Sequence, residues 1–295
     1  MFSAQISGPR LRRSEALRGA RHRSRDVTAR DSERATGGVR VIEATVIFAA
    51  GVWAGMINVI VGSGTLITFP TLLLFGYPAL TANVSNNIGL VAGGLSGVHG
   101  YRAEALRHRA LLLRLAPASV LGALTGAILL LVLPADSFRA IVPVLISIGL
   151  VMVVAGPAVQ RRTARRRAEP GTAPRTPRWV LPLGVYAAGI YGGYFGAAQG
   201  ILLVGLLGVL LTIGLQDING IKNVLATIVN AVAAIAFMIV AWDKIDWEVV
   251  GLIAAGSLLG GQLGAKIGRR LPPPVLRAVI LVIGVVALVK IVFFD

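Results

Sequence analysis

Hydrophobic residues along the chain fall into apolar segments that are separated by short polar or glycine-containing stretches. Most segments have the roughly 20 residues that a helix needs to cross a bilayer, whereas two of them are shorter. Between Glu43 and Arg102 no residue is formally charged. The pattern predicts membrane helices, complete or broken, over residues 41–60, 65–76, 81–100, 110–133, 137–157, 179–198, 201–215, 220–242, 248–268 and 274–294.

The segments after residue 178 repeat those before residue 158. Motifs recur at a constant offset of 138 residues, in the pairs Gly51 and Gly189, Gly55 and Gly193, Gly62 and Gly200, Gly122 and Gly260, Gly126 and Gly264, and Arg139 and Arg277. This offset indicates an internal duplication. We therefore predict an all-α integral membrane protein with two homologous helical repeats, over residues 41–157 and 179–295. Such duplicated halves are typical of secondary transporters.

Composition supports a membrane protein, because the chain is 55% hydrophobic and only 14% charged, with a mean hydropathy of +0.77. The net charge of +16 would suit nucleic-acid binding if it were spread over a soluble surface. Instead, ten arginines lie in residues 1–40 and seven in residues 161–178. Basic segments that flank apolar spans mark the cytoplasmic side. We expect a multi-pass protein of the bacterial inner membrane that contacts lipid and binds no nucleic acid.

The polar segments carry further expectations. The basic tail, residues 1–40, is predicted to be disordered because it cannot bury a core, or else to reflect a wrongly chosen start codon. Residues 158–178 are predicted to form a basic cytoplasmic linker. The chain has no cysteine and three scattered histidines, so we expect no disulfide, no metal site and no cofactor.

Two topologies fit the charges. If the tail, the loop 101–109 and the linker are all cytoplasmic, the chain has about eight crossings plus short re-entrant arms, and the two halves are parallel. This arrangement is preferred, although it places Arg269 and Arg270 outside and the acidic loop 243–248 inside. A ten-crossing arrangement with inverted halves corrects both loops but places the tail outside.

The first candidate site is the glycine break in the first repeat, formed by Asn58, Gly62, Ser63, Gly64 and Thr65. Irregular backbone is tolerated in a membrane only against protein or a watery cavity. If Thr65 begins a half-helix, its N–H groups and the Ser63 and Thr65 hydroxyls can bind an anion. The alternative is a helix hinge without a ligand. The corresponding break in the second repeat, with Gln199 and Gly200, is less polar.

The second candidate is a polar cluster at the head of the next apolar segment, formed by Asn83, Ser85, Asn86 and Asn87. Neutral donors can hold an anion without fixing its charge, and polar groups in a membrane are costly unless they are paired or functional. The alternative is an N-cap at the interface. All four residues are included in the predicted substrate site.

Lys222 and Asn223 occupy the corresponding place in the second repeat. The Lys222 ammonium can pair with an anionic substrate or extend to the membrane surface. Asp217 can neutralise it, which would favour a structural role. Glycines spaced four apart, as at Gly256, Gly260 and Gly264, predict close helix packing, within the monomer or in a homo-oligomer.

Several of these motifs resemble the sulfite exporter TauE/SafE family of bacterial membrane proteins. They are Gly62–Pro70, the Gly76-Tyr77-Pro78 turn, Ala82–Asn86 and Gly100-Tyr101-Arg102. The resemblance covers about residues 41–295, and Ser63 and Thr65 stand where family members often have more glycine. It implies transport of sulfur-containing anions, such as sulfite or sulfonates, with export as the expected direction.

We therefore predict a secondary transporter that works by alternating access between its halves. No ATP-binding P-loop pattern occurs, so the energy must come from a gradient or from an ATPase partner. The alternatives are a channel-like anion or metal-ion permease, which for metal ions predicts acidic or histidine clusters, and a membrane enzyme, which needs a nucleophile–base pair. Neither pattern is seen in the apolar segments, so no enzyme activity and no catalytic residue are expected.

Overall fold

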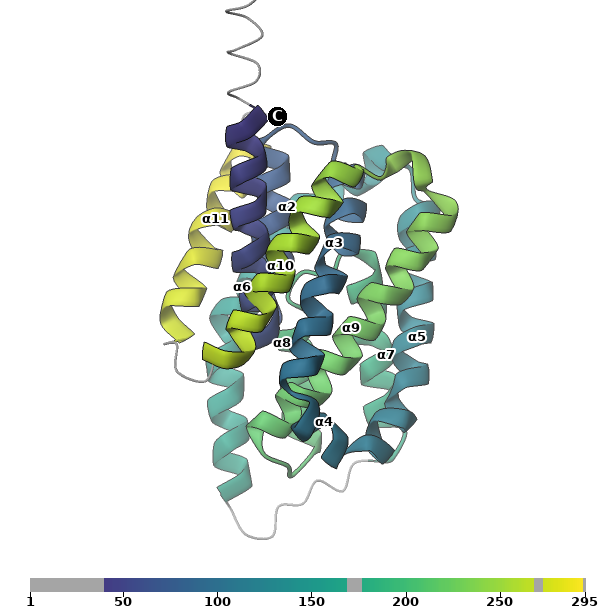
Figure 1. Ribbon diagram of the computed structural model, residues 1–295. Coiled ribbons are helices and arrows are strands. Elements are labelled where there is room, and N and C mark those ends of the chain that lie inside the picture. The colour runs from purple at the N-terminus through teal and green to yellow at the C-terminus, as the bar shows by residue number, and fades with distance from the viewer. Residues whose placement is uncertain (1–39, 169–176, 268–272, 294–295) are drawn as a thin grey trace, which may run out of the picture. The chain divides into compact units, whose positions relative to one another are not determined.

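The computed structural model describes residues 40–168, 177–267 and 273–293, and within these ranges it consists of helices without strands (Figure 1). The helices are Arg40–Ile60, α2 (Thr65–Leu74), α3 (Ala79–Gly100), α4 (Arg102–Arg107), α5 (Arg109–Val132), α6 (Ala135–Ala168), α7 (Val180–Tyr194), α8 (Gln199–Leu210), α9 (Leu215–Val240), η1 (Trp242–Lys244), α10 (Trp247–Ile267) and α11 (Pro273–Phe293). The described residues from Val46 onward pack as one unit.

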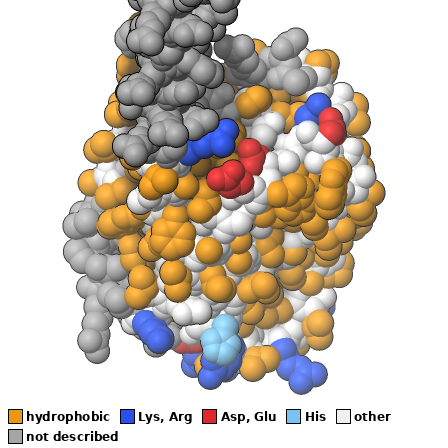
Figure 2. Space-filling view, turned by 45° about the horizontal axis from the view of Figure 1, so that its top comes forward, with side chains coloured by type: hydrophobic (Ala, Val, Ile, Leu, Met, Phe, Trp, Pro, Cys, Tyr) orange, Lys and Arg blue, Asp and Glu red, His pale blue; other side chains and the backbone are white. Residues whose placement is uncertain are grey.

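The helices have the composition of a membrane protein. Five of those described are long and apolar enough to cross a bilayer, and α2 and α8 are shorter apolar helices. Figure 2 shows a broad band of hydrophobic side chains, with charged side chains gathered toward its two edges. The predicted all-α, multi-pass membrane protein is confirmed. The number of crossings and the division into two homologous repeats stay predictions.

The boundary between the first repeat and the linker differs from the prediction. α6 continues to Ala168, whereas the sequence places the start of the linker at residue 158. The added residues are mainly arginine and alanine, which favour helix, so the helix extends beyond its apolar part. The rest of the linker up to residue 176, the tail up to residue 39, and Arg269 and Arg270 lie outside the described residues.

Glycine faces bring helices into close contact, as predicted, and the helices they join belong to different predicted repeats. A Cβ on Gly122 of α5 would overlap the backbone of Gly189 on α7. In the same way, a Cβ on Gly260 of α10 would overlap the backbone of Val52 in the helix Arg40–Ile60. Small residues allow helix backbones to approach this closely. Each repeat therefore packs one of its broken helices against a long helix of the other repeat.

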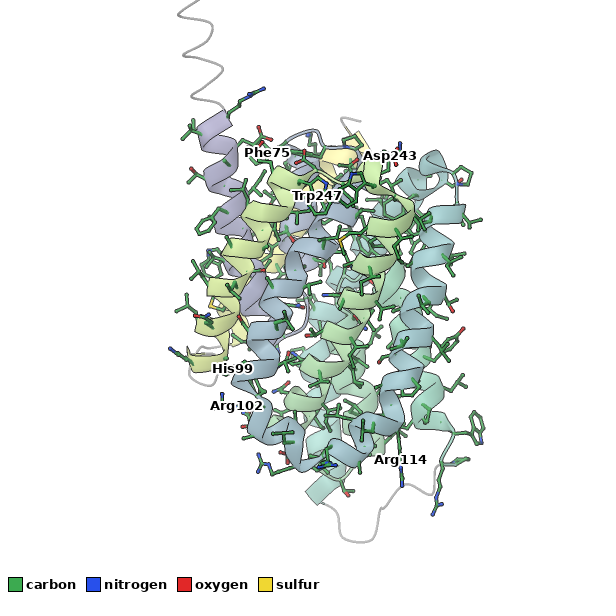
Figure 3. The ribbon with its side chains drawn as sticks, turned by 45° about the vertical axis from the view of Figure 1, so that its right-hand side comes forward. Phe75, His99, Arg102, Arg114, Asp243 and Trp247 are labelled. Atoms are coloured by element: carbon green, nitrogen blue, oxygen red, sulfur yellow. The ribbon has the colours of Figure 1, made fainter. Side chains whose placement is uncertain are left out.

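The two predicted repeats run in opposite directions. α7 runs parallel to α5, which begins at the end where Arg114 lies, and residues 48–56 run parallel to α10, which begins at the Trp247 end (Figure 3). Figure 3 also places Asp243 at the end opposite to Arg102. The parallel eight-crossing arrangement, which puts the loops 101–109 and 243–248 on the same side of the membrane, is therefore wrong. It failed because it gave the basic tail more weight than the acidic loop between α9 and α10.

Each broken pair of helices enters and leaves at the same end. α2 finishes at Phe75, at the end where α10 begins, so it returns to the end from which residues 48–56 run (Figure 3). α9 begins beside α4, where Asp217 pairs with Arg107, so α8 likewise returns to the end where α7 begins. The two pairs thus form hairpins that point toward each other from opposite ends (Figure 1).

Candidate functional site

The two broken helix pairs touch at their turning points. Gly62 and Gly196 adopt φ values of 87° and 79°, which residues with a side chain rarely adopt. The N–H of Gly200 donates a hydrogen bond to the carbonyl oxygen of Gly62 over 3.1 Å. A Cβ on either of these two residues would overlap the backbone of the other. The predicted break residues Gly62 and Gly200 are therefore in direct contact, and we call this contact the junction.

Asn86 links α3 to the first turn of α2 beside the junction. Its Nδ2 donates to Thr65 Oγ1 over 3.3 Å, and its Oδ1 accepts a hydrogen bond from Thr68 Oγ1. Thr65 also faces the second break, because a Cβ on Gly196 would lie 3.5 Å from its Oγ1. Thr68 was not among the site residues predicted from the sequence. Its position one helical turn after Thr65 was the available signal.

The central helices α3 and α9 each bind the end of a broken helix in the other repeat. Asn83 Nδ2 on α3 donates to the carbonyl oxygen of Tyr194, the last residue of α7, over 3.0 Å. Lys222 Nζ on α9 donates to the carbonyl oxygens of Asn58 and Val59 over 3.1 and 2.8 Å. Carbonyl oxygens in the last turn of a helix lack N–H donors within the helix, so these side chains donate to them instead.

Lys222 is fully buried, so its side chain does not extend to the membrane surface. Asp217 is not its partner either, since it pairs with Arg107 over 3.1 Å and with His108 over 3.5 Å. Those three side chains form a separate cluster where α4 meets α9. At the opposite end, outside the membrane spans, a hydrogen bond from Lys244 lowers the pKa of the Asp243 carboxyl.

Four polar atoms on the segments that form or flank the junction are buried without a hydrogen-bond partner among the described residues. They come from the first break, α3, α8 and α9, and they are Ser63 Oγ, Asn87 Oδ1, Gln199 Nε2 and Asn223 Nδ2. Each of these four residues is next in sequence to Gly62, Asn86, Gly200 or Lys222, which make the contacts described above. A buried polar atom without a partner costs about 1–3 kcal/mol, so this set is a candidate for binding a ligand.

Two predicted residues lie elsewhere. Ser85 faces α10, and its Oγ accepts a hydrogen bond from the N–H of Asp246 over 2.9 Å. Gly64 packs against the helix Arg40–Ile60, where a Cβ would lie 3.0 Å from Asn58 Cβ. The structure therefore brings Gly62, Gly200, Thr65, Asn86 and Lys222 together at the junction but places Ser85 on another face of α3. Residues 83, 86 and 87 share a face that residue 85 does not.

Charge at the junction is restricted to one cation. The two breaks and their arms carry no formal charge from residue 44 to 101 and from residue 179 to 216, and Lys222 reaches the first break from α9. Within the ranges that the structure covers, no group of three His, Cys, Asp or Glu side chains could hold a metal ion. Two apolar grooves, along α6 with α8 and along α6 with α11, are lined by none of the junction residues.

Comparison with known proteins agrees with the motif resemblance. A family model described as sulfite exporter TauE/SafE matches residues 47–291. The chain is 26% identical over 256 residues to the "Probable membrane transporter protein YfcA" of Escherichia coli (strain K12), covering 84% of this chain and 89% of the relative. It is 27% identical over 256 residues to a "Probable membrane transporter protein" of Haemophilus influenzae, covering 84% and 94%.

Proposed function

Because the chain belongs to the sulfite exporter TauE/SafE family, and is therefore a membrane transporter, we propose that it carries small sulfur-containing anions such as sulfite or sulfonates out of the bacterial cell. The substrate binds at the junction between the two breaks. Transport proceeds by alternating access, in which the hairpins separate toward one end of the membrane and then toward the other.

The observation that carries this proposal is the set of buried polar atoms without partners around a single cation. Ser63, Gln199 and Asn223 supply hydroxyl and amide donors, which can bind the oxygen atoms of an oxyanion. The starts of α2 and α8 add the positive ends of helix dipoles. With Lys222 as the charged group, the site favours an anion over a cation.

Burial of the junction supports a transporter rather than an open channel. Ser63 and Lys222 are both fully buried, and Gly62 and Gly200 close the gap between the hairpin tips. An ion can pass only if the hairpins move apart. Inverted halves that meet at a closed central site are what alternating access requires.

A binding and flux screen tests the proposal. Purified protein is heated with sulfite, sulfate, thiosulfate, methanesulfonate or small carboxylates, and uptake of the anions that raise the melting temperature is then measured in proteoliposomes. We expect sulfite or a sulfonate to stabilise the protein and to be transported. Stabilisation and flux with carboxylates alone would overturn the assignment.

Matched serine variants locate the site. Ser63→Ala removes a hydroxyl at the junction, whereas Ser96→Ala removes one that donates to the carbonyl oxygen of Leu258 over 3.0 Å, between α3 and α10. We expect Ser63→Ala to weaken anion binding about tenfold, as for one lost hydrogen bond to a charged group. Ser96→Ala is expected to leave anion affinity unchanged. Equal effects of the two variants would argue against the junction.

A further inference from the structure

Lys222 binds the C-terminal end of a helix, a position that favours a cation. Its Nζ contacts the carbonyl oxygens of Asn58 and Val59, which lie in the last turn of the helix Arg40–Ile60. This end carries the negative pole of the helix dipole. The stem of the same side chain passes the second break, where a Cβ on Gly200 would lie 3.1 Å from Lys222 Cδ. One side chain thus contacts both hairpin tips, with its amino group at the first and its stem at the second.

Carbonyl dipoles, rather than a carboxylate, surround this amino group. None of the three ion pairs among the described residues includes Lys222. Glu104 packs its Cβ against Gly220 on α9, two residues before Lys222. The other ionisable side chains on α9, on the helices packed against it and on the first helix are Asp217 on α9, His99 on α3, Arg102 and Arg107 on α4, Arg109 and Arg114 on α5, Tyr186, Tyr191 and Tyr194 on α7, Asp243 and Lys244 on η1, and Arg40 and Glu43.

Burying an ammonium group that has no carboxylate partner costs free energy, so the Lys222 side chain can also exist as the neutral amine. An anion that enters the junction favours the ammonium form by direct attraction. By linkage, protonation of Lys222 must raise the affinity for the anion by the same factor. The proton passes from water to the Nζ lone pair and back again, and no other bond changes.

We propose that Lys222 is a proton-binding site, so that each anion crosses the membrane together with one proton. The ammonium form holds Asn58 and Val59 and keeps the junction closed. The neutral form releases these carbonyls, and the hairpin tips separate. This inference rests on the proposed transport function, but its first test needs no substrate.

Thiol labelling measures closure of the junction directly, because the chain has no native cysteine. Ser63→Cys places a single thiol at the buried junction, and its rate of reaction with a maleimide is measured from about pH 6 to about pH 9. This labelling rate is divided by the rate in the double variant Ser63→Cys/Lys222→Met, whose methionine side chain binds no proton. We expect this ratio to rise from about 0.1 at low pH toward 1 at high pH.

Two further variants complete the labelling test. Lys290→Met, made together with Ser63→Cys, removes a second lysine that binds carbonyl oxygens at a helix end. Its labelling rate should match that of the Ser63→Cys protein in which Lys222 and Lys290 are both present. Lys222→Arg keeps a permanent charge and should hold labelling slow across the pH range, which decides the question if Lys222→Met does not fold. A ratio independent of pH, or an equal effect of Lys290→Met, would overturn the proposal.

Proton movement is then followed in proteoliposomes with a pH-sensitive dye inside. Methanesulfonate is the probe because it is fully ionised and carries no proton of its own. We expect its uptake to acidify the interior, and uptake without acidification would overturn the coupling. If no sulfonate enters while the labelling ratio still changes with pH, the proposed substrate class is contradicted and the proton site at Lys222 is supported.

Discussion

The N–H of Gly200 donates a hydrogen bond to the carbonyl oxygen of Gly62 over 3.1 Å, which joins two helix breaks that stand 138 residues apart in the sequence. The two glycines occupy the same place in the two repeats. Their contact brings together hairpins that enter from opposite ends of the molecule. The candidate site is built around this contact.

Replacing Gly200 by alanine should separate the hairpin tips. The added Cβ would overlap the backbone of Gly62, and overpacking of this kind costs roughly 1–3 kcal/mol. We expect a lower melting temperature in detergent, measured by differential scanning fluorimetry. Gly251→Ala is the control, because a Cβ at Gly251 meets nothing within 4 Å. A drop of equal size in both variants would contradict the close contact.

Thr68→Val should destabilise the protein more than Thr71→Val. The Thr68 hydroxyl donates to Asn86 Oδ1, which would be left buried without its donor at a cost of about 1–3 kcal/mol. The Thr71 hydroxyl donates to the carbonyl oxygen of Ile67 in its own helix, so its loss should cost within about 0.5 kcal/mol. Thermal unfolding of both variants checks the order, and the reverse order would exclude the network around Asn86.

Lys290→Met should weaken the end of α2. Lys290 Nζ donates to the carbonyl oxygens of Leu73 and Leu74 over 3.0 and 2.9 Å, and charged caps of this kind contribute about 1 kcal/mol. Lys266→Met, at the exposed end of α10, should change stability by less than about 0.5 kcal/mol. Melting temperatures compare the two, and a neutral Lys290→Met would show that water replaces the cap without loss.

Labelling of single cysteines should show that the two predicted repeats are inverted. A cysteine in place of Lys244 lies at the end opposite to one in place of Leu106, because Asp243 and Arg102 lie at opposite ends (Figure 3). In whole cells, a membrane-impermeant maleimide should label Lys244→Cys directly and Leu106→Cys only after the membrane is opened, since the basic loop is expected to be cytoplasmic. Labelling of both from the same side would contradict the inverted arrangement.

Much of the candidate site could be predicted from sequence because the chemical signals are local. Glycine and hydroxyl residues that interrupt an apolar segment mark a break, and asparagines at the head of a helix are unusual in a membrane. Thr68 was missed because threonine is common in apolar helices. Ser85 was included because spacing along the chain does not show which neighbour each helix face meets.

By itself, the sequence determined the class of the protein, the limits of most helices, both breaks and the family. Hydropathy and glycine spacing act within a few residues, so they can be read without knowing the neighbours. Only the tertiary structure decided the direction of the second repeat, the contact between Gly62 and Gly200, and the partners of Lys222. These depend on which helices pack together across the two repeats, and many packings satisfy the same hydropathy and charge pattern.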